Sequence, residues 1–275
     1  MLLAFDVGNT ETTIGLFYGT TLLDHWRIST RQRDTVDELG LLVRSLVRES
    51  GFDLTMIRAT MIASVVPPLT PTLIEMSERH LGVPAGTIEP QADLPVRLDV
   101  EEPLSVGADR IANTIAVSTL FRRDTIVVDL GTATTFDCIG GDGTFLGGVI
   151  APGVQSGADT LVKRTAKLPR VDLEPPPAVI GRRTETALQS GIFLTAVETI
   201  DGIVRRIERE WGRKKTLVIA TGGLAPLLAR HCETVDRVEP FLTLYGLQIA
   251  YEAVAAERRG ARFSMIKAPE PGRLR

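Results

Sequence analysis

The sequence predicts an α/β fold built from two related halves. An apolar run, an aspartate, a glycine-containing turn and a threonine-rich return segment occur in this order at residues 2–15 and again at residues 125–140. Segments with strand and helix periodicity alternate after each pattern, which is typical of helices packed on sheets. We therefore expect two domains, residues 1–115 and 116–256, followed by a disordered tail at residues 257–275.

The first turn combines residues that suit a phosphate and its metal. An apolar run ends on Asp6, whose carboxylate is expected to face the turn. Gly8 lets the backbone pass close to a ligand, because glycine has no side chain to collide with it. Asn9, Thr10 and Thr12 add small donors, and successive turn N–H groups can form an anion-binding concavity. A plain hairpin turn with an acidic tip is the alternative interpretation.

The second turn repeats this spacing. Asp129 is followed by Gly131 two residues later and by Thr135 six residues later, as in the first turn, and Thr132 lies between them. Two such turns facing each other would form a clamp for a nucleotide. The sequence contains no G-x-x-x-x-G-K-[ST] motif, which excludes a Walker-type loop. The two aspartate turns would have to hold the phosphates instead.

The first half is predicted to place a strand meander before its helices. Thr35 and Glu38 have the spacing of a capping box at the start of the first helix. Thr70 and Pro71 match the N-cap and the first position of a second helix, which stops near Gly82. The opening strand is followed by expected strands at residues 12–18, 22–29 and 61–65.

The second half is predicted to repeat this order. Three prolines at residues 175–177 require an extended loop. Gly222 and Gly223 follow a β-rich run, and either let a flat ring or a phosphate approach the backbone or form a simple strand-to-helix turn. The expected strands are residues 144–150 and 215–220, and the expected helices are residues 156–163 and 184–211, a short helix through 230, and residues 242–256.

Two charged residues mark the start of the helix expected between the halves. Asp109 and Arg110 precede the apolar segment 111–121, so they fall in its first turn, where N–H donors are free and an acidic group is favoured. They form either an N-terminal cap with an ion-pairing arginine or a general base beside an anion-holding arginine.

Composition excludes several classes of function. Residues 257–275 carry six basic and two acidic residues, which leaves a net charge of −7 on residues 1–256 and argues against general nucleic-acid binding. Two cysteines and three isolated histidines do not make a disulfide framework or a zinc site. The chain lacks an export signal and an apolar run of about 18 residues, so we expect a cytoplasmic protein that does not enter a membrane.

Eight motifs in order resemble the type III pantothenate kinases, within the superfamily of actin, chaperones and sugar kinases. The resemblance covers residues 2–252, nearly the whole chain, and implies two duplicated ribonuclease-H-like domains with mixed sheets flanked by helices. The motifs are DVGNT at 6–10, SVVP at 64–67, GADR at 107–110, DLGTATT at 129–135, PGV at 152–154, AKLPRV at 166–171, GRRTETALQSG at 181–191 and TGG at 221–223.

The resemblance implies that the chain transfers the γ-phosphate of ATP to the primary hydroxyl of pantothenate, the first step towards coenzyme A. It implies that Asp6 helps to hold Mg²⁺ through water and that Asp129 binds K⁺ or NH₄⁺. The implied ATP-binding residues are Asp6, Gly8, Asn9, Thr10, Thr132, Gly222 and Gly223. The implied pantothenate-binding residues are Gly107, Ala108, Asp109, Arg110 and Thr184, with Asp109 as the proton acceptor and a homodimer that has the active site at its interface.

The sequence departs from the family pattern at two positions. Val100 stands where family members commonly have a tyrosine, and Arg183 replaces the usual asparagine before Thr184. We expect a normal fold with altered affinity for the substrate. Two other functions are considered: a catalytically silent family member that acts as a regulatory factor, and a superfamily kinase or phosphatase with a different acceptor. The intact Asp6, Asp109, Asp129 and Thr184 favour catalysis, and the GADR and GRRT motifs favour pantothenate.

Overall fold

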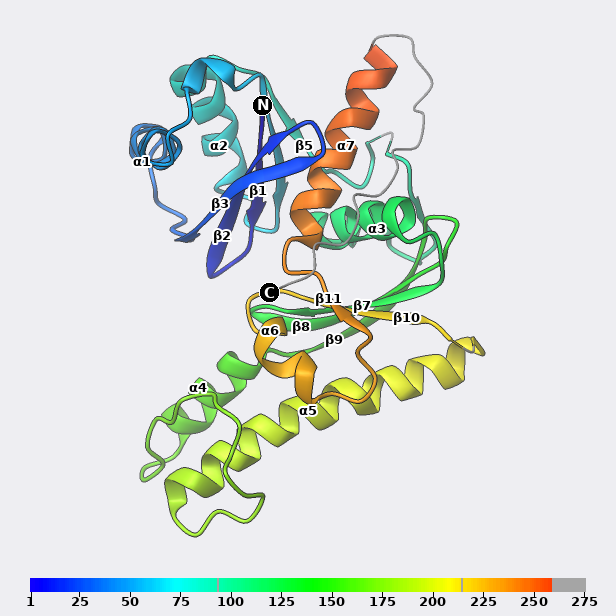
Figure 1. The fold of residues 1–275 in the computed structure, drawn as a ribbon. Helices are drawn as coiled ribbons and strands as arrows, with labels where there is room; N and C mark the ends of the chain where they lie inside the picture. The colour runs from blue at the N-terminus through cyan, green and yellow to red at the C-terminus, as the bar shows by residue number, and fades with distance from the viewer. Residues whose placement is uncertain (93, 214, 259–275) are drawn as a thin grey trace. The chain divides into compact units, whose positions relative to one another are not determined.

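The computed structural model describes residues 1–92, 94–213 and 215–258, so nearly all of the predicted tail lies outside the described residues. The chain forms two compact units, and neither is a continuous stretch of sequence (Figure 1). The domain boundary predicted between residues 115 and 116 separates the two sequence repeats, and it stays a prediction. Unit 1 contains Met1–Arg122, Gly140–Phe145 and the segment that begins at Leu242, and unit 2 contains Arg123–Ile139 and Leu146–Phe241.

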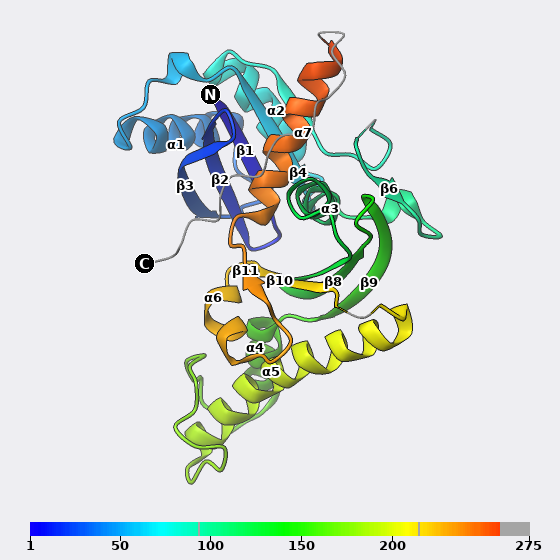
Figure 2. The same cartoon turned by 45° about the vertical axis from the view of Figure 1, so that its right-hand side comes forward.

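Unit 1 is built on a five-stranded mixed sheet with the order β3-β2-β1-β4-β5. The central strand β1 is antiparallel to β2 and parallel to β4. Its apolar residues are buried on both faces, because helices cover both sides of the sheet (Figure 2). The strands are β1 Leu2–Val7, β2 Glu11–Tyr18, β3 Thr21–Ser29, β4 Ala59–Ser64 and β5 Ala85–Thr87.

Helix α1 (Val36–Glu49) covers one face of this sheet together with α2. Its apolar residues join a buried cluster that includes Phe5 of β1. The N–H of Glu38 donates to the Thr35 hydroxyl at 3.3 Å, and the N–H of Thr35 donates to the Glu38 carboxylate at 2.9 Å. The predicted capping box is confirmed, and it satisfies N–H groups that a helix start otherwise leaves unpaired.

Helix α2 (Thr70–Met76) begins one residue earlier than the sequence predicted. Its N-cap is Leu69 and Thr70 is already helical, so the prediction of Thr70 as the N-cap is wrong. The Thr70 hydroxyl donates to the Val66 carbonyl at 3.5 Å instead. The chain continues through a short π turn and stops as predicted at Gly82, whose φ of +67° suits glycine.

Helices α3 (Ala108–Leu120) and α7 (Leu242–Arg258) pack against each other in unit 1, and α7 also contacts β1, β2 and β4. The two helices approach so closely that a β-carbon at Gly246 would lie 2.0 Å from the carbonyl oxygen of Ala112. Only glycine fits at this position without moving one of the helices. The last helix of the chain therefore completes the unit that the first strand begins.

The second sheet repeats the strand order of the first. Its order is β11-β10-β7-β8-β9-β6, and β7 is antiparallel to β8 and parallel to β10, as β1 is to β2 and β4. This repetition confirms the predicted α/β class with two mixed sheets. The strands are β6 Arg97–Leu98, β7 Thr125–Leu130, β8 Ala133–Ile139, β9 Thr144–Pro152, β10 Leu217–Thr221 and β11 Arg237–Val238, of which β6 and the first two residues of β9 belong to unit 1.

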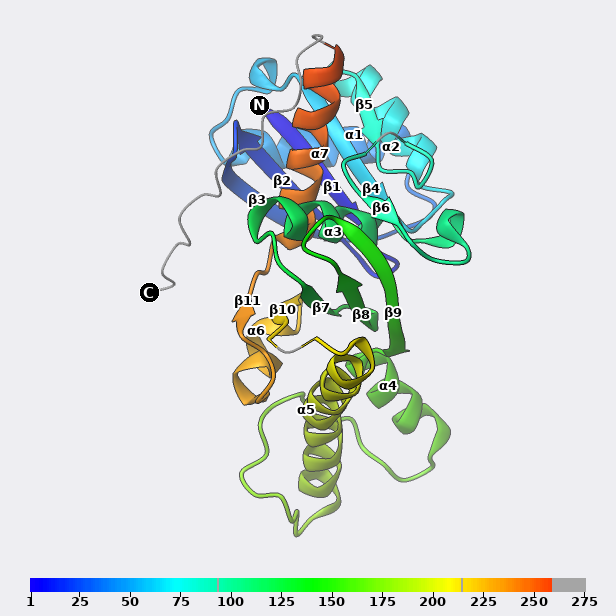
Figure 3. The ribbon, with the colours of Figure 1, turned by 90° about the vertical axis from the view of Figure 1, so that its right-hand side faces the viewer.

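Helix α5 (Thr184–Trp211) is the main helix of unit 2 and has the predicted bounds. Its apolar face joins a buried cluster with residues of β7, β8 and β10, and α4 lies on the same side of the sheet (Figure 3). By length and composition α5 is the one described helix that could cross a membrane, and 44% of that stretch is buried in the structure. The remaining helices are α4 Val154–Arg164 and α6 Ala225–Leu228.

A buried carboxylate joins α5 to the loop before β11. Asp201 is 3% exposed and accepts hydrogen bonds from the N–H groups of Glu233 and Thr234 and from the Thr234 hydroxyl, at 2.6–2.9 Å. Burial alone would raise the pKa of the Asp201 carboxyl, but these donors and Arg205 outweigh burial and hold the pKa below its ordinary value. The charged form of Asp201 therefore stabilises the fold.

Replacing Asp201 with asparagine is expected to destabilise unit 2 by about 1–3 kcal/mol at pH 7, because hydrogen bonds to a charged acceptor become bonds to a neutral one. Because the folded-state pKa of Asp201 is lowered, its contribution is full above the ordinary carboxyl pKa and is lost as the pH falls through the folded value. Urea unfolding of both proteins at several pH values tests this. A stability difference that stayed constant well below pH 4 would contradict it.

Candidate active site

The first predicted turn is a three-residue connection between β1 and β2. Asp6 is the penultimate residue of β1 and is partly buried, while Asn9 and Thr10 are exposed. The N–H of Gly8 donates to the Glu11 carbonyl at 3.0 Å and closes the turn. The structure therefore places an acidic strand end directly before exposed polar residues, as the sequence predicted.

The second turn, between β7 and β8, is one residue shorter. Asp129 is also the penultimate residue of its strand, and only Gly131 and Thr132 separate β7 from β8. As a result Asp129 lies opposite Thr135 in the sheet, whereas Asp6 lies opposite Thr13. The aspartates are equivalent in the two repeats, but the threonines six residues after them are not.

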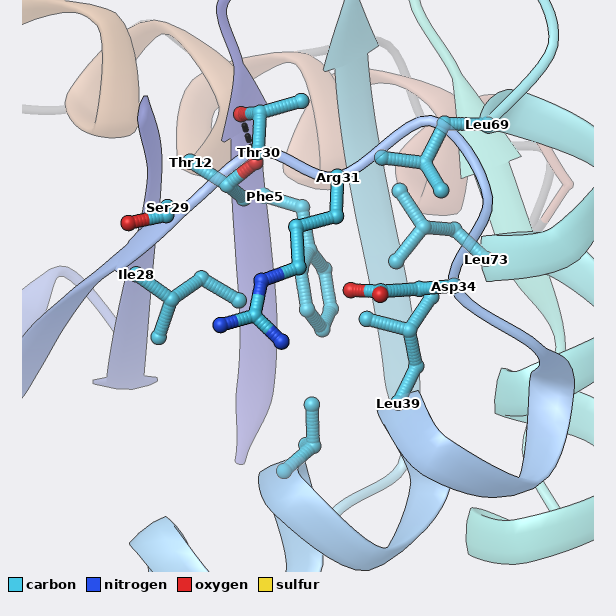
Figure 4. A pocket seen from close by; sticks show the side chains of 11 residues that line it. Phe5, Thr12, Ile28, Ser29, Thr30, Arg31, Asp34, Leu39, Leu69 and Leu73 are labelled. Carbon is cyan, nitrogen blue, oxygen red and sulfur yellow. Dashed lines mark hydrogen bonds between the residues drawn. The ribbon is translucent and has the colours of Figure 1, made fainter. Parts of the chain in front are cut away.

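This register corrects the expectation for Thr12. Thr12 lies opposite Val7, and neighbouring strand residues alternate between faces, so its side chain is on the opposite face of the sheet from Asp6. It is buried, and its hydroxyl lies 2.8 Å from the hydroxyl of Thr30 (Figure 4). Thr12 joins β2 to the residue that follows β3 and does not act as a donor in the turn.

The predicted base lies at the start of α3. Gly107 is the N-cap, so Ala108, Asp109 and Arg110 form the first turn of the helix. One Asp109 oxygen, Oδ1, accepts the N–H of Arg110 at 2.8 Å. Burial raises the pKa of the Asp109 carboxyl, although the Arg110 N–H and guanidinium act in the opposite direction. A carboxylate that is costly to keep charged is suited to accepting a proton.

Gly107 leaves room for the Asp109 carboxylate. A β-carbon at Gly107 would lie 2.5 Å from Oδ1 of Asp109 and 3.5 Å from the Val65 side chain. The N–H of Val65 in turn donates to the carbonyl of Val7 at 3.0 Å. Within unit 1, Val65 therefore connects the start of α3 with the end of β1, next to Asp6.

The second turn is held by the start of α4. A β-carbon at Gly153 would lie 2.0 Å from the carbonyl oxygen of Thr132, and the Ser156 hydroxyl donates to the same oxygen at 3.0 Å. Sequence reasoning missed these two supports. The PGV motif was visible, but a close approach of two backbones has no signature in the sequence beyond the glycine itself.

Gly222 lies directly against Asp129. Thr221 is paired with Asp129 in the sheet, and a β-carbon at Gly222 would lie 2.5 Å from Oδ1 of Asp129 and 2.8 Å from the Leu130 backbone. The φ of Gly222 is +86°, which also favours glycine. Unit 2 thus brings together Asp129, the following turn and the glycine pair, with Gly223 exposed beside them.

Thr184 stands apart from this group. It is the first residue of α5 and is exposed, and it hydrogen-bonds to none of these groups within the part of the chain that the structure describes. Among those same residues, no three His, Cys, Asp or Glu side chains are grouped closely enough to hold a metal.

Two small cavities contain none of the predicted site residues except Thr12, which lines the first of them. The cavity in Figure 4 has a volume of about 10 Å³, enough for about one water molecule, and Arg31 and Asp34 are among the residues that line it. A cavity of about 170 Å³ in unit 2 is lined by α4, α5 and residues 170–172. A nucleotide fits neither. The candidate residues form one group in unit 1, at the first turn and the start of α3, and one group in unit 2, at the second turn and the glycine pair.

A model of the type III pantothenate kinase family matches residues 2–206. The chain belongs to this family. A type III pantothenate kinase from Moorella thermoacetica is 46% identical over 252 residues, which cover 92% of this chain and 99% of the relative. One from Exiguobacterium sp. is 44% identical over 92% of this chain and 98% of the relative. These matches confirm the resemblance to the type III pantothenate kinases that the eight motifs indicated.

Solved structures share the fold of this family member. A Campylobacter jejuni protein described as a conserved Baf family transcriptional activator has a TM-score of 0.57 at 20% identity, covering 92% of this chain and 99% of its own. The activator of 2-hydroxyisocaproyl-CoA dehydratase from Clostridium difficile has a TM-score of 0.51 at 11% identity, covering 96% and 99%. At these identities the likeness concerns the fold alone.

Proposed function

We propose that this chain transfers the γ-phosphate of ATP to the primary hydroxyl of pantothenate, the first step of coenzyme A synthesis, in the cytoplasm. Family membership supports this activity. The main structural support is Asp109, a partly buried residue in the first turn of α3, because its raised carboxyl pKa suits a proton acceptor. Phosphoryl transfer otherwise depends on positioning and on neutralising charge.

The two aspartate turns are proposed to hold ATP. Gly8, Asn9 and Thr10 would hold phosphate oxygens with their backbone N–H groups and small polar side chains, and Thr132 would do so from the second turn. Gly222 and Gly223 would line the adenosine side, where the absence of side chains leaves room for a flat ring. Support comes from the equivalent positions of Asp6 and Asp129 at the ends of β1 and β7.

Cations are proposed to bind at the two carboxylates. Asp6 would hold Mg²⁺ through water, and Asp129 would hold K⁺ or NH₄⁺; both offer the oxygen ligands that hard cations prefer. The fit is supported by Gly222, because a β-carbon there would fill the space beside Oδ1 of Asp129. When bound, the cations would neutralise phosphate charge, and the carboxylates would fix their positions.

The acceptor is proposed to bind at the start of α3. Gly107 and Ala108 would face pantothenate with backbone groups, Arg110 would hold its carboxylate, and Asp109 would accept the proton of the attacking hydroxyl. Thr184 would complete the site from the partner subunit of a homodimer with the active site at the interface. Its exposed position at the start of α5 leaves it accessible to a second chain.

An assay of the purified chain with ATP, pantothenate, Mg²⁺ and K⁺ tests the proposal, with phosphopantothenate detected by mass spectrometry. Product is expected in K⁺ or NH₄⁺ buffer, and replacing K⁺ by Na⁺ should lower the rate. Equal rates in K⁺ and Na⁺ would remove the role proposed for Asp129. If no product formed under any condition, the chain would be better explained as a catalytically silent regulatory member of the family.

A further inference from the structure

Phe145 is buried beneath the side chain of Arg110. The guanidinium carbon of Arg110 lies 5.0 Å from the centre of the Phe145 ring, and Phe145 is 1% exposed. An arginine over an aromatic face within about 6 Å is attracted by the negative charge of the ring face, and more strongly where water is excluded. This contact lies entirely within unit 1.

Backbone hydrogen bonds fix the segment that carries the ring. Phe145 is the second residue of β9 and is paired with Leu98 of β6. The N–H of Asp99 donates to the Phe145 carbonyl at 2.9 Å, and the N–H of Gly140 donates to the Thr144 carbonyl at 2.8 Å, closing the turn before it. The backbone that carries the ring is therefore held in place, and burial of the ring restricts its movement.

The position of Arg110 is tied to that of the base. Its N–H donates to Asp109 Oδ1 at 2.8 Å, and its carbonyl accepts the Thr114 hydroxyl at 2.8 Å. These two bonds fix the backbone of Arg110, and the contact with Phe145 acts on its side chain. A guanidinium carries its N–H donors in one plane, so an attraction that holds it over an aromatic ring limits the directions in which those donors can meet a carboxylate.

We infer that Phe145 is a positioning residue, which orients the Arg110 guanidinium to receive the carboxylate of the acceptor. This inference rests on the proposed function and adds the residue that selects an anionic acceptor. Removing the ring would take away one contact that orients the charged Arg110 side chain, and any loss of that orientation has to be restored on binding, which would lower affinity for a carboxylate. Affinity for ATP would not depend on the ring.

The test compares Phe145→Leu with the wild type on two acceptors: pantothenate, and its neutral analogue in which the carboxylate is replaced by a primary alcohol. Phe145→Leu is expected to raise the KM for pantothenate roughly 2- to 30-fold, the range that a contact of this type supports. The KM for the analogue, the KM for ATP and kcat should change less than twofold. Phe145→Tyr keeps the ring face and should retain most of the affinity.

Phe17→Leu is the matched control, since Phe17 is an equally buried ring of unit 1 that contacts Tyr245. It should lower the melting temperature without changing the KM for pantothenate. An equal rise in the KM for both acceptors in Phe145→Leu, or the same rise in Phe17→Leu, would overturn the inference. If Phe145→Leu failed to fold, Phe145→Met would replace it.

Calorimetric titration of pantothenate into each protein separates the inference from the proposed function, because it does not require turnover. Weaker binding to Phe145→Leu than to the wild type supports the positioning role even if no product forms. Equal binding to both proteins overturns that role. The kinase activity of the wild type is tested separately, by the product assay described above.

Discussion

Replacing Asp109 with asparagine is expected to lower kcat about 100- to 10,000-fold, the range in which a positioned general base contributes. Asparagine has nearly the same shape, and its side-chain carbonyl can still accept the Arg110 N–H that Oδ1 accepts at 2.8 Å. The fold and the affinity for ATP should therefore persist. The measurement is steady-state phosphorylation of pantothenate together with ATP titration.

The same substitution should not reduce stability at pH 7. Burial raises the folded-state pKa of Asp109, so the charged carboxylate destabilises the fold above that pKa and has no effect below the ordinary value, where both states are protonated. The variant is thus expected to melt no lower than the wild type at pH 7, and the difference should disappear in acid. For the same reason, wild-type activity should be lost on acidification at a higher pH than if the base were an exposed aspartate.

Asp99→Asn is a suitable control, because Asp99 is an exposed carboxylate of the same unit. It should keep wild-type activity. Activity of Asp109→Asn within a factor of two of the wild type would show that Asp109 is not the base.

Replacing Gly153 with alanine is expected to disrupt the second turn. The new β-carbon would lie 2.0 Å from the Thr132 carbonyl oxygen and 3.0 Å from that of Gly131, so one backbone has to move. The φ of Gly153 is −66°, which alanine adopts easily, and the effect would come from the collision alone. We expect a loss of about 1–3 kcal/mol in stability, typical of overpacking, and ATP affinity lowered at least tenfold.

Gly157→Ala provides the comparison within the same helix. No atom lies within 4 Å of the position of its β-carbon, so alanine should raise stability by up to about 1 kcal/mol through helix propensity. Calorimetric ATP titration and thermal melting of both variants measure the contrast. The role given to the start of α4 would be disproved by two variants with the same affinity for ATP.

The sequence predicted the repeated part of the fold because each repeat contains local signals. The apolar run, Asp6 and the following glycine reappear around Asp129, and the sheets built on them have the same strand order. The first turn of α3 was also predictable, since a helix start has a local composition. These features depend on residues that are close in sequence.

Other features depend on contacts that no local pattern contains. One additional residue in the first turn moves Thr12 to the buried face, and this was hidden by the matching spacing of the two repeats. The cap of α2 lies one residue earlier than predicted, and the Thr70 hydroxyl bonds backward to Val66 instead of capping the helix. Gly153 and Phe145 act on residues that are distant in sequence, at Thr132 and Arg110. Such pairs become visible only after the chain has folded.

The discontinuous composition of unit 1 has a consequence for the order of folding during synthesis. Residues 1–122 leave the ribosome first, but α7 follows more than 100 residues later and fills the space beside α3 where only Gly246 fits. Unit 2 ends at Phe241, before α7 begins. Domains generally fold in the order of synthesis. Here the unit that starts first is completed last, so the nascent chain carries all five strands of the N-terminal sheet without α7 while unit 2 is being made.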